Sequence, residues 1–275
     1  MRVASDRVAP TRVTCIANGL DLLTAPLAHE AVTRERAHRP WPLPARSWIM
    51  AQTWTDLLFA HWSVEPQALR DVLPPQLPLD TFDGKAYIGV TPFGVRNMRL
   101  RLSPAVPLLS AFAEINVRTY VTVDAKPGIY FFSLDAASRL AVATARRAYR
   151  LPYFHARMSI GRDAGETRFT SRRLSDEAPA RADFRGRYRP INEPFQAPGD
   201  SLEHWLTERY CLYTFDERRR IQRGDIHHPP WPLQAAEADI EINTMAAEIG
   251  LDLPNPPLLH YARRQDVVFW SLRPR

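Results

Sequence analysis

Side chains that alternate between apolar and polar at every second residue dominate this chain and limit what it can fold into. In the segment Tyr149–Met158, "YRLPYFHARM", a tyrosine, a histidine and an arginine share one parity after the proline, while a phenylalanine, an alanine and a methionine share the other. Strict period-2 alternation is typical of a β-strand with one apolar and one polar face. The segment therefore predicts a strand, and the open question is whether its polar face meets water or lines a pocket.

Comparable segments follow one another from Trp48 to the C-terminus. Turn signals such as Asp83-Gly84 and "AKPG" separate them. The predicted strands lie in "SWIMAQTWTDLLFAHW", "KAYIGVTPFGV", "AFAEINVRTYVTV", "IYFFSL", "YFHARM", "ETRFTSRR", "ADFRGRY", "RYCLYTF", "EADIEIN" and "DVVFWSL".

Helical patterns are few and short. "EPQALRDVLP" starts near a proline suited to a first turn, "DAASRLAVATARRAY" has Asp135 as a candidate N-cap with Pro152 beyond its end, and "GDSLEHWLTE" has Asp200 or Ser201 as its cap. Many strands with a few short helices, and no internal repeat, predict a mainly β chain of the α+β class. The expected architecture is an antiparallel barrel or sandwich with the helices packed outside.

The first 45 residues differ from the rest of the chain. They are rich in Arg, Ala and Pro and have weak periodicity, so we expect residues 1–45 to form a flexible or partly helical extension. Residues 46–275 are expected to form a single domain, since the chain is long enough for a sizeable core.

The net charge of +6 does not indicate a nucleic-acid partner. The basic residues are 34 arginines and only two lysines, Lys85 and Lys126, a bias typical of genome composition. The arginines are interleaved with acids, as in "DEAPARADFRGRYR", rather than gathered in a basic run. We therefore expect no nucleic-acid binding.

Other partners and compartments are limited in the same way. No apolar run approaches the roughly 18 residues of a membrane span, and no secretory signal is recognisable, so the expected location is cytoplasmic with no membrane partner. Cys15 and Cys211 fit a reducing compartment, and neither has a partner at the spacing of a metal site. We expect no metal and no cofactor.

The first candidate site lies in "EINVRTY". Glu114, Asn116, Arg118 and Tyr120 share one parity of this predicted strand. Arg118 could bind a substrate carboxylate through two hydrogen bonds, and Glu114 could transfer protons. The alternative is the solvated face of an antiparallel strand, which is the commoner arrangement.

The second candidate is the strand at Tyr153. Tyr153 and His155 share a face, and a tyrosine–histidine pair can perform acid–base chemistry. The alternative is again that these polar side chains are exposed to solvent, while Phe154 and Met158 on the other face of the strand lie in the core.

The third candidate is "DIHHPPWPL". The adjacent His227 and His228 would point to opposite faces of a strand, so they are not expected to share a metal ion. The prolines that follow favour a rigid turn that holds Trp231 in place, which is a structural role. The alternative is that His228 lines a pocket and contacts a ligand. The chain has none of the sequence signatures of α/β-hydrolases, zinc proteases, P-loop proteins or dinucleotide-binding folds.

Several long motifs resemble the YqjF-like family, a domain-of-unknown-function family numbered 2071. They are "WIMAQTWTDLLFAHW", "LDTFDGKAYIGVTPF", "FAEINVRTYV", "PGIYFFSLDA", "LTERYCLY" and "HPPWPL", in this order over roughly residues 47–272. That family is in turn distantly similar to the acetoacetate decarboxylase superfamily. The resemblance implies a cone-like antiparallel β-barrel around a central pocket for residues 46–275.

The same resemblance implies that the chemistry differs from that of the decarboxylase. The decarboxylase forms a Schiff base on a lysine that follows a proline, and the register places Tyr153 at this position and Phe154 after it. A phenol cannot form an imine, and both lysines of the chain lie in predicted turns. We therefore expect Schiff-base chemistry to be absent.

The resemblance also favours the pocket over the solvated face, since the matching positions of the decarboxylase point into its barrel. It implies an enzyme or enzyme-derived protein acting on an anionic or carbonyl-bearing small molecule, with a homo-oligomer as one assembly to test. The alternative is a non-catalytic binding or sensing module for a hydrophobic metabolite, and a purely structural role ranks third. The predicted catalytic residues are Glu114, Arg118 and Tyr153, and the predicted ligand-binding residues are Asn116, His155, His228 and Trp231.

Overall fold

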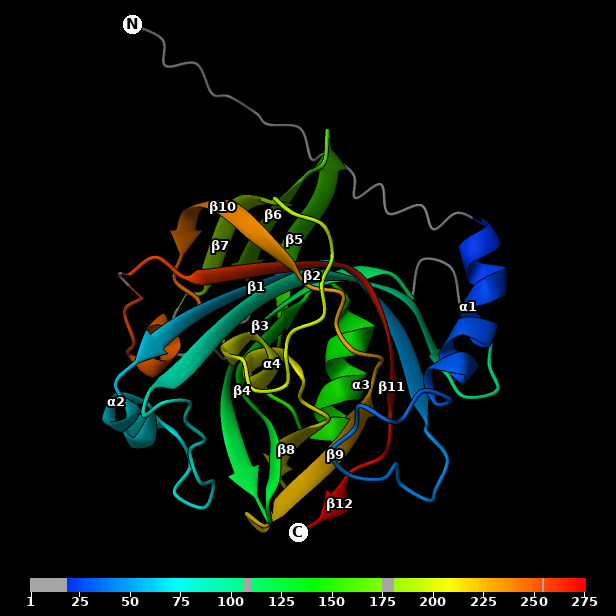
Figure 1. Cartoon of the computed structure of the whole chain (residues 1–275), viewed down its shortest axis with the longest axis horizontal. Coiled ribbons are helices and arrows are strands. Elements are labelled where there is room, and N and C mark those ends of the chain that lie inside the picture. The colour runs from blue at the N-terminus through cyan, green and yellow to red at the C-terminus, as the bar shows by residue number, and fades with distance from the viewer. Residues whose placement is uncertain (1–18, 106–109, 175–180, 254) are drawn as a thin grey trace, which may run out of the picture.

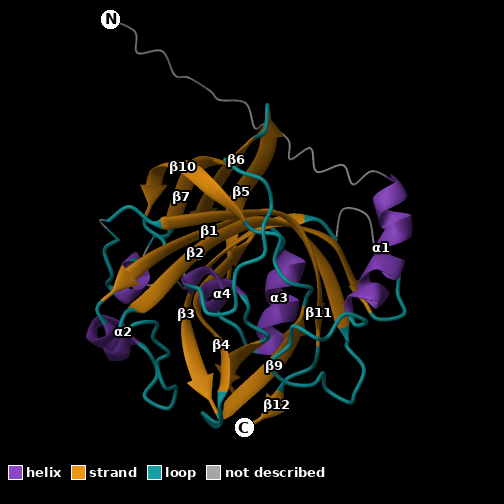
Figure 2. Ribbon diagram, viewed as in Figure 1, coloured by secondary structure: helices purple, strands orange, loops and turns teal. Residues whose placement is uncertain are grey.

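The structure, a computed structural model, describes residues 19–105, 110–174, 181–253 and 255–275, with side chains described from residue 24 onward. Strands dominate these residues (Figures 1 and 2). The strands are β1 (Met50–Val64), β2 (Ala86–Leu100), β3 (Phe112–Val123), β4 (Lys126–Ala136), β5 (Tyr153–Asp163), β6 (Glu166–Arg173), β7 (Asp183–Pro190), β8 (Cys211–Phe215), β9 (Ile221–His227), β10 (Gln234–Asn243), β11 (Leu258–Phe269) and β12 (Arg273–Pro274). The helices are α1 (Gly19–Val32), α2 (Pro66–Val72), α3 (Arg139–Tyr149), α4 (Leu202–Thr207) and the 3₁₀-helix η1 (Ala247–Ile249).

Five neighbouring strands, in the order β4-β3-β2-β1-β11, form a sheet that closes on itself in two ways. Strands β10, β7, β6 and β5 lead from β11 back to β4, and strands β9 and β8 also lead from β11 back to β4. The pairs β4–β5 and β4–β8 are parallel, and the other pairs are antiparallel. The predicted barrel is therefore confirmed, with parallel pairs at β4.

One face of the shared sheet packs against an apolar core. Leu58 of β1, Val90 of β2 and Ile115 of β3 belong to the same buried cluster as Phe169 of β6 and Phe184 of β7. The circuit closed by β5, β6, β7 and β10 is thus filled with side chains. We call this half the filled circuit.

The opposite parity of the same strands faces the circuit closed by β8 and β9. There Phe59 and Phe93 belong to a buried cluster with Trp231, and Tyr120 belongs to another with Leu212 of β8. Because successive side chains of a strand point to opposite faces, each of the shared strands serves both circuits. We call this second half the hollow circuit, since it contains the cavity described below.

Local capping explains where the helices start. Ser138 caps α3 by accepting a hydrogen bond from the backbone N–H of Ala141 at 3.2 Å, and Ser201 caps α4 through His204 in the same way. The expectation that Asp135 caps α3 was wrong. Asp135 lies in β4, where its buried carboxylate pairs with Arg173 of β6 at 2.8 Å.

The hairpin turns position both lysines away from the barrel interior. Asp83 and Gly84 have positive φ angles of 48° and 74°, as a tight hairpin turn requires, and Lys85 follows them. In the next hairpin the positive φ angles fall on Asp124 and Ala125, and Lys126 begins β4. Lys126 lies 5.8 Å from the ring of Trp41, outside the hollow circuit.

Part of the N-terminal segment, expected to be a flexible or partly helical extension, forms the helix α1 and packs on the barrel. Residues 1–18 lie outside the described residues, whereas α1 contacts β1, β2 and β11 (Figure 1). His29 is fully buried and its Nε2 lies 3.1 Å from the hydroxyl of Thr53, and Arg39 donates to the carbonyl of Ile226 at 2.6 Å. Buried hydrogen bonds to the barrel explain the difference, since they outweigh the weak apolar pattern of this segment. No helix within the described ranges is long and apolar enough to cross a membrane.

Candidate ligand-binding and active site

The hollow circuit encloses a cavity of about 390 Å³. Its wall is formed by side chains of β1, β2, β3, β4, β5, β8, β9 and β11, by one side of α3, and by the segment around Trp231. Most of these side chains are apolar, such as Ile129, Leu134 and Phe269. A cavity of this volume is in the range that holds a small organic molecule.

The predicted pair Glu114 and Tyr153 meets inside this cavity. The Tyr153 hydroxyl donates a hydrogen bond to Glu114 Oε2 at 3.1 Å, and both side chains line the wall. Tyr153 reaches this position because β5 starts directly after Pro152 and pairs with β4 through Leu134. The sequence interpretation that placed Tyr153 beside the strand carboxylate agrees with this geometry.

Burial controls the ionisation of this pair. Desolvation raises the pKa of Glu114 to about 8, the hydrogen bond from Tyr153 opposes that rise, and the charge of Asp135 adds to it. Burial and the neighbouring Glu114 also hold the pKa of Tyr153 well above its usual value of 10. Near neutral pH the pair therefore consists of a protonated carboxyl group and a neutral phenol.

Arg118 is a buried cation that has no acidic partner in the part of the chain that the structure describes. It is 6% exposed, and its Nε and Nη2 atoms have no hydrogen-bond partner among the described residues. Its Cζ atom lies 5.1 Å from the centre of the Phe59 ring, and the ring of Tyr120 is next to it at 5.9 Å. Gly89 makes room for this packing, because a Cβ atom there would lie only 3.3 Å from Arg118 Cγ.

Asn116 lines the cavity between Glu114 and Arg118 on β3. Its Oδ1 atom is buried without a hydrogen-bond partner in the described part of the chain, as is the hydroxyl of Thr91 on β2. The two residues are directly paired across the strands. Buried polar atoms are normally satisfied, so these oxygens mark a place where a ligand can supply hydrogen-bond donors.

His228 and Trp231 also line the cavity, as predicted for ligand contacts. The ring of His228 stacks on Tyr210 at 4.7 Å, and its Nδ1 lies 2.8 Å from the carbonyl of Pro229. The ring of Trp231 packs edge-on against Phe59 at 4.9 Å and stacks on Trp54 at 6.0 Å. The adjacent His227 points to the outer face, where its Nε2 lies 3.0 Å from the carbonyl of Val32, so the predicted separation of the two histidines is confirmed.

His155 is the one predicted ligand-binding residue that does not line the cavity. It shares its parity with Tyr153, but β5 pairs with β4 only over Tyr153–His155 and then continues beside β6. The strand thus leaves the cavity wall directly after Tyr153. His155 lies at the half-exposed edge where the two sheets diverge.

Sequence analysis did not identify Arg209, which also lines the cavity. Its guanidinium forms an ion pair with Asp80 at 2.7 Å and packs over the rings of Trp205 and Tyr120 at 4.3 and 4.9 Å. The only local signal was its place within the "LTERYCLY" motif, which says nothing about burial. Its carboxylate partner is 129 residues away in the chain.

Neither lysine of the chain lines the cavity, so no amine is available there for an imine. Across the described ranges, no group of three or more His, Cys, Asp or Glu side chains is arranged to hold a metal ion. The ionisable groups on the cavity wall are therefore one carboxyl group, two phenols, three guanidinium groups and one imidazole, from Glu114, Tyr149, Tyr153, Arg99, Arg118, Arg209 and His228.

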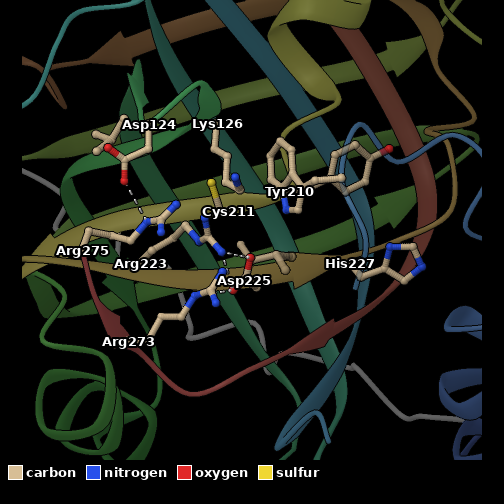
Figure 3. Close-up of polar contacts among 12 residues, drawn as sticks. Asp124, Lys126, Tyr210, Cys211, Arg223, Asp225, His227, Arg273 and Arg275 are labelled. Atoms are coloured by element: carbon tan, nitrogen blue, oxygen red, sulfur yellow. Dashed lines mark hydrogen bonds and ion pairs between the residues drawn. The ribbon is translucent and has the colours of Figure 1, made fainter. Parts of the chain in front are cut away.

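A second charged cluster lies on the outer face of β9 and is separate from the cavity. Figure 3 shows Arg223 and Arg273 on either side of the Asp225 carboxylate, and Arg275 beside Asp124. The corresponding ion-pair distances are 3.3 to 3.4 Å. Two of the three arginines belong to the last three residues of the chain, so this cluster fixes the C-terminal segment against β9.

Comparison with known proteins gives a family and a fold. Residues 51–266 match the family DUF2071, described as an uncharacterized conserved protein. The protein "Uncharacterized protein YqjF" of Bacillus subtilis (strain 168) is 51% identical over 232 residues, which cover 84% of this chain and 94% of that protein.

Solved structures with low sequence identity share the fold. The enduracididine biosynthesis enzyme MppR complexed with pyruvate has a TM-score of 0.60 at 14% identity, covering 87% of this chain and 94% of that chain. The acetoacetate decarboxylase of Legionella pneumophila has a TM-score of 0.58 at 10% identity, covering 89% of this chain and 95% of that chain. The predicted barrel of the acetoacetate decarboxylase type is thereby confirmed.

Proposed function

The chain belongs to the DUF2071 family, and we propose that it is an enzyme, or a protein derived from one, that acts on a carbonyl or carboxylate compound without a Schiff-base lysine. One observation carries this proposal: the unpaired Arg118 and the Glu114–Tyr153 pair line the same cavity. The similar fold of MppR holds pyruvate, an oxo acid, which supports the same class of ligand here.

Arg118 binds the anionic group of the ligand. An unpaired charge that is removed from water is costly, and the ligand anion compensates that cost. The two free donors, Nε and Nη2, lie on the same edge of the guanidinium and match the two oxygens of a carboxylate. A neutral ligand would leave this charge without a partner.

Glu114 exchanges a proton with the carbon next to the ligand carbonyl. As a base it breaks a C–H bond, takes the proton on its carboxylate, and leaves the electron pair to form an enolate. A pKa of about 8 suits this role, because a proton-transfer group works best when its pKa lies near the working pH.

Tyr153 stabilises the charge that develops on the carbonyl oxygen. Its phenol stays protonated over the whole working range because its pKa is raised well above 10, so it is always a hydrogen-bond donor. In the free protein this O–H donates to Glu114; once Glu114 has taken the proton from the ligand, its own O–H donates to the Tyr153 oxygen, and the phenol O–H turns to the enolate oxygen and stabilises it. Tyr153 thus takes over by hydrogen bonding what an imine would achieve covalently.

A ligand screen with the purified protein tests this proposal. Oxo acids, diketones, aromatic acids and lipid-like acids are tested for an increase in Tm, and each hit is treated with borohydride. We expect hits among the carboxylates, no covalent trapping, and loss of the Tm increase in Arg118→Ala. Arg157→Ala, which removes an exposed arginine of β5, is the matched control. Covalent trapping on Lys85 or Lys126 contradicts the proposal.

A non-catalytic binding or sensing module is the second candidate, because most of the cavity wall is apolar. The two candidates separate on turnover. A binder returns its ligand chemically unchanged, whereas the proposed enzyme exchanges hydrogen for deuterium next to the ligand carbonyl.

A further inference from the structure

Arg118 and Glu114 lie far apart along the cavity. Both belong to β3, four residues apart and on the same face; the pairing of β3 with β2 is continuous over this range, whereas its pairing with β4 shifts by one residue between Val117 and Arg118. At 3.3 to 3.4 Å per residue, their Cα atoms are separated by ~13 Å. The anion-binding group and the proton-transfer group are therefore not neighbours.

The side chains do not close this gap. The guanidinium of Arg118 packs against Phe59 at 5.1 Å and against Tyr120 at 5.9 Å, and Arg118 also acts on the pKa of Tyr120. Glu114 is held at its own level by the hydroxyl of Tyr153, which comes from β5. No ion pair joins Arg118 to Glu114 among the described residues, and Arg118 is not one of the charges that act on the pKa of Glu114. We therefore take the spacing of the two functional groups as on the order of 10 Å, somewhat below that of their Cα atoms.

The surrounding charges show the same division. Tyr153 and Asp135 are the groups that act on the pKa of Glu114, whereas Arg118 acts on the pKa values of His61 and Tyr120 at the other end. The cavity therefore has an anion-binding end and a separate proton-transfer level.

The space between the two ends suits the body of an extended molecule. Leu134, which is paired with Asn116, provides apolar surface at this level, and the unpartnered oxygens of Asn116 and Thr91 can accept from a polar substituent on the body of the ligand. The volume agrees: a cavity of ~150 Å³ holds benzene, with six heavy atoms, so 390 Å³ corresponds to about 15 heavy atoms. A three- or four-carbon oxo acid would fill only a minor part of it.

We propose that the substrate is an extended oxo acid, in which the carboxylate and the reacting carbonyl are separated by on the order of 10 Å. An extended chain advances ~1.2 Å per bond, which gives about eight bonds between the two groups. The substrate class is thus a medium-chain oxo carboxylate or a molecule of comparable length, rather than a 2-oxo or 3-oxo acid. This inference rests on the roles of Arg118 and Glu114 given under the proposed function.

A ladder of methyl-ketone acids tests the length directly. The probes are pyruvate, acetoacetate, 4-oxopentanoate, 6-oxoheptanoate, 8-oxononanoate and 10-oxoundecanoate, each used with the purified full chain. Calorimetry gives Kd, and NMR in deuterium oxide gives the rate of hydrogen exchange next to the ketone at saturation. Nonanoate, which has the carboxylate but no ketone, is the control for binding by chain length alone.

We expect the exchange rate at saturation to be at least tenfold higher for 8-oxononanoate or 10-oxoundecanoate than for any acid with four carbons or fewer. Glu114→Gln should abolish exchange while changing Kd less than threefold, and Arg118→Met should raise Kd at least tenfold. Arg157→Ala should change neither, since it alters an exposed arginine outside the cavity.

Two outcomes separate this inference from the proposed function. Fastest exchange with pyruvate or acetoacetate, dependent on Glu114, would overturn the extended substrate and leave the proposed function standing. Binding of the whole ladder with affinities that Arg118→Met leaves unchanged would overturn both. Tighter binding with length, but no maximum in the exchange rate, would show a hydrophobic pocket without the proposed geometry and would also reject the inference.

Discussion

The two circuits of this barrel share five strands and differ in what their side chains do. In the filled circuit, Val90 and Ile115 pack against Phe169 in a buried apolar cluster. In the hollow circuit, the opposite parity of the same strands carries Glu114 and Arg118 around a cavity of about 390 Å³. Alternate side chains of the same strands thus point to opposite faces: one set forms the apolar core, and the other set lines the cavity.

This difference explains why an alternating strand pattern can mislead. A polar row beside an apolar row usually means solvent on one side. In β3 both rows are buried, and Glu114, Asn116 and Arg118 of the polar row are only 4 to 6% exposed. The polar residues of this strand face the cavity of the hollow circuit rather than solvent.

The largest effect is expected from a truncation in the filled circuit. Phe169 is fully buried between Phe184 and the shared sheet, so Phe169→Ala should lower the free energy of unfolding by about 3–5 kcal/mol. Urea unfolding measures this loss. Ligand affinity of the folded fraction should stay within twofold of the wild type. A loss below ~1 kcal/mol would mean that this half is not the stabilising core.

The pH dependence of stability should reveal the hollow circuit. The folded-state pKa of Glu114, about 8, lies above its ordinary value of 4.5, so the folded protein holds a proton that the unfolded chain has lost between these values. Stability attributable to Glu114 is therefore present at low pH and lost as pH rises from ~4.5 to 8, by roughly 1 kcal/mol per pH unit.

Glu114→Gln isolates this contribution, since it keeps the shape of the side chain and cannot ionise. The difference in unfolding free energy between variant and wild type should grow in favour of the variant up to pH ~8 and then level off. Subtracting the two profiles removes the titrations of Asp135 and of the buried histidines. A difference that is constant with pH would mean that the Glu114 carboxyl group is not desolvated.

Arg118→Met should separate stability from binding. A buried guanidinium without an acidic partner is a cost in the free protein, so an apolar side chain of similar length should raise the unfolding free energy by about 1 kcal/mol. The same change should weaken carboxylate binding by about 1.5–3 kcal/mol, because it removes charge-assisted hydrogen bonds. Thermal unfolding and calorimetry measure the two effects. Arg118→Met that is less stable than the wild type would show that Arg118 has a structural partner.

The sequence predicted much of this arrangement because strand parity is local information. It identified Glu114, Asn116 and Arg118 as one face, and the family resemblance implied that Tyr153 points into the barrel; the structure places all four on the cavity. Parity along one strand cannot say which neighbour covers each face. That choice is made by pairings between distant segments, such as β8 with β4.

Where prediction failed, a distant partner decided the outcome. The local sequence suggests that Asp135 caps a helix, but its carboxylate forms a buried ion pair with Arg173, which lies 38 residues later in the chain. Arg209 has no local pattern that marks it as buried, and its burial depends on Asp80. His155 was expected beside Tyr153, and the divergence of β5 from β4 removes it.

The smallest effect is expected at Tyr153. Tyr153→Phe removes one hydrogen bond to Glu114 in the hollow circuit and should lower the unfolding free energy by only about 1 kcal/mol. Because that hydrogen bond lowers the pKa of Glu114, its loss should raise this pKa further above 8. The pH profile of ligand hydrogen exchange should shift in the same direction, since the base must first be deprotonated. NMR titration of Glu114 measures the shift without a substrate. A pKa that falls in Tyr153→Phe would mean that water enters and solvates the carboxylate, and that Tyr153 serves chiefly to keep this level of the cavity dry.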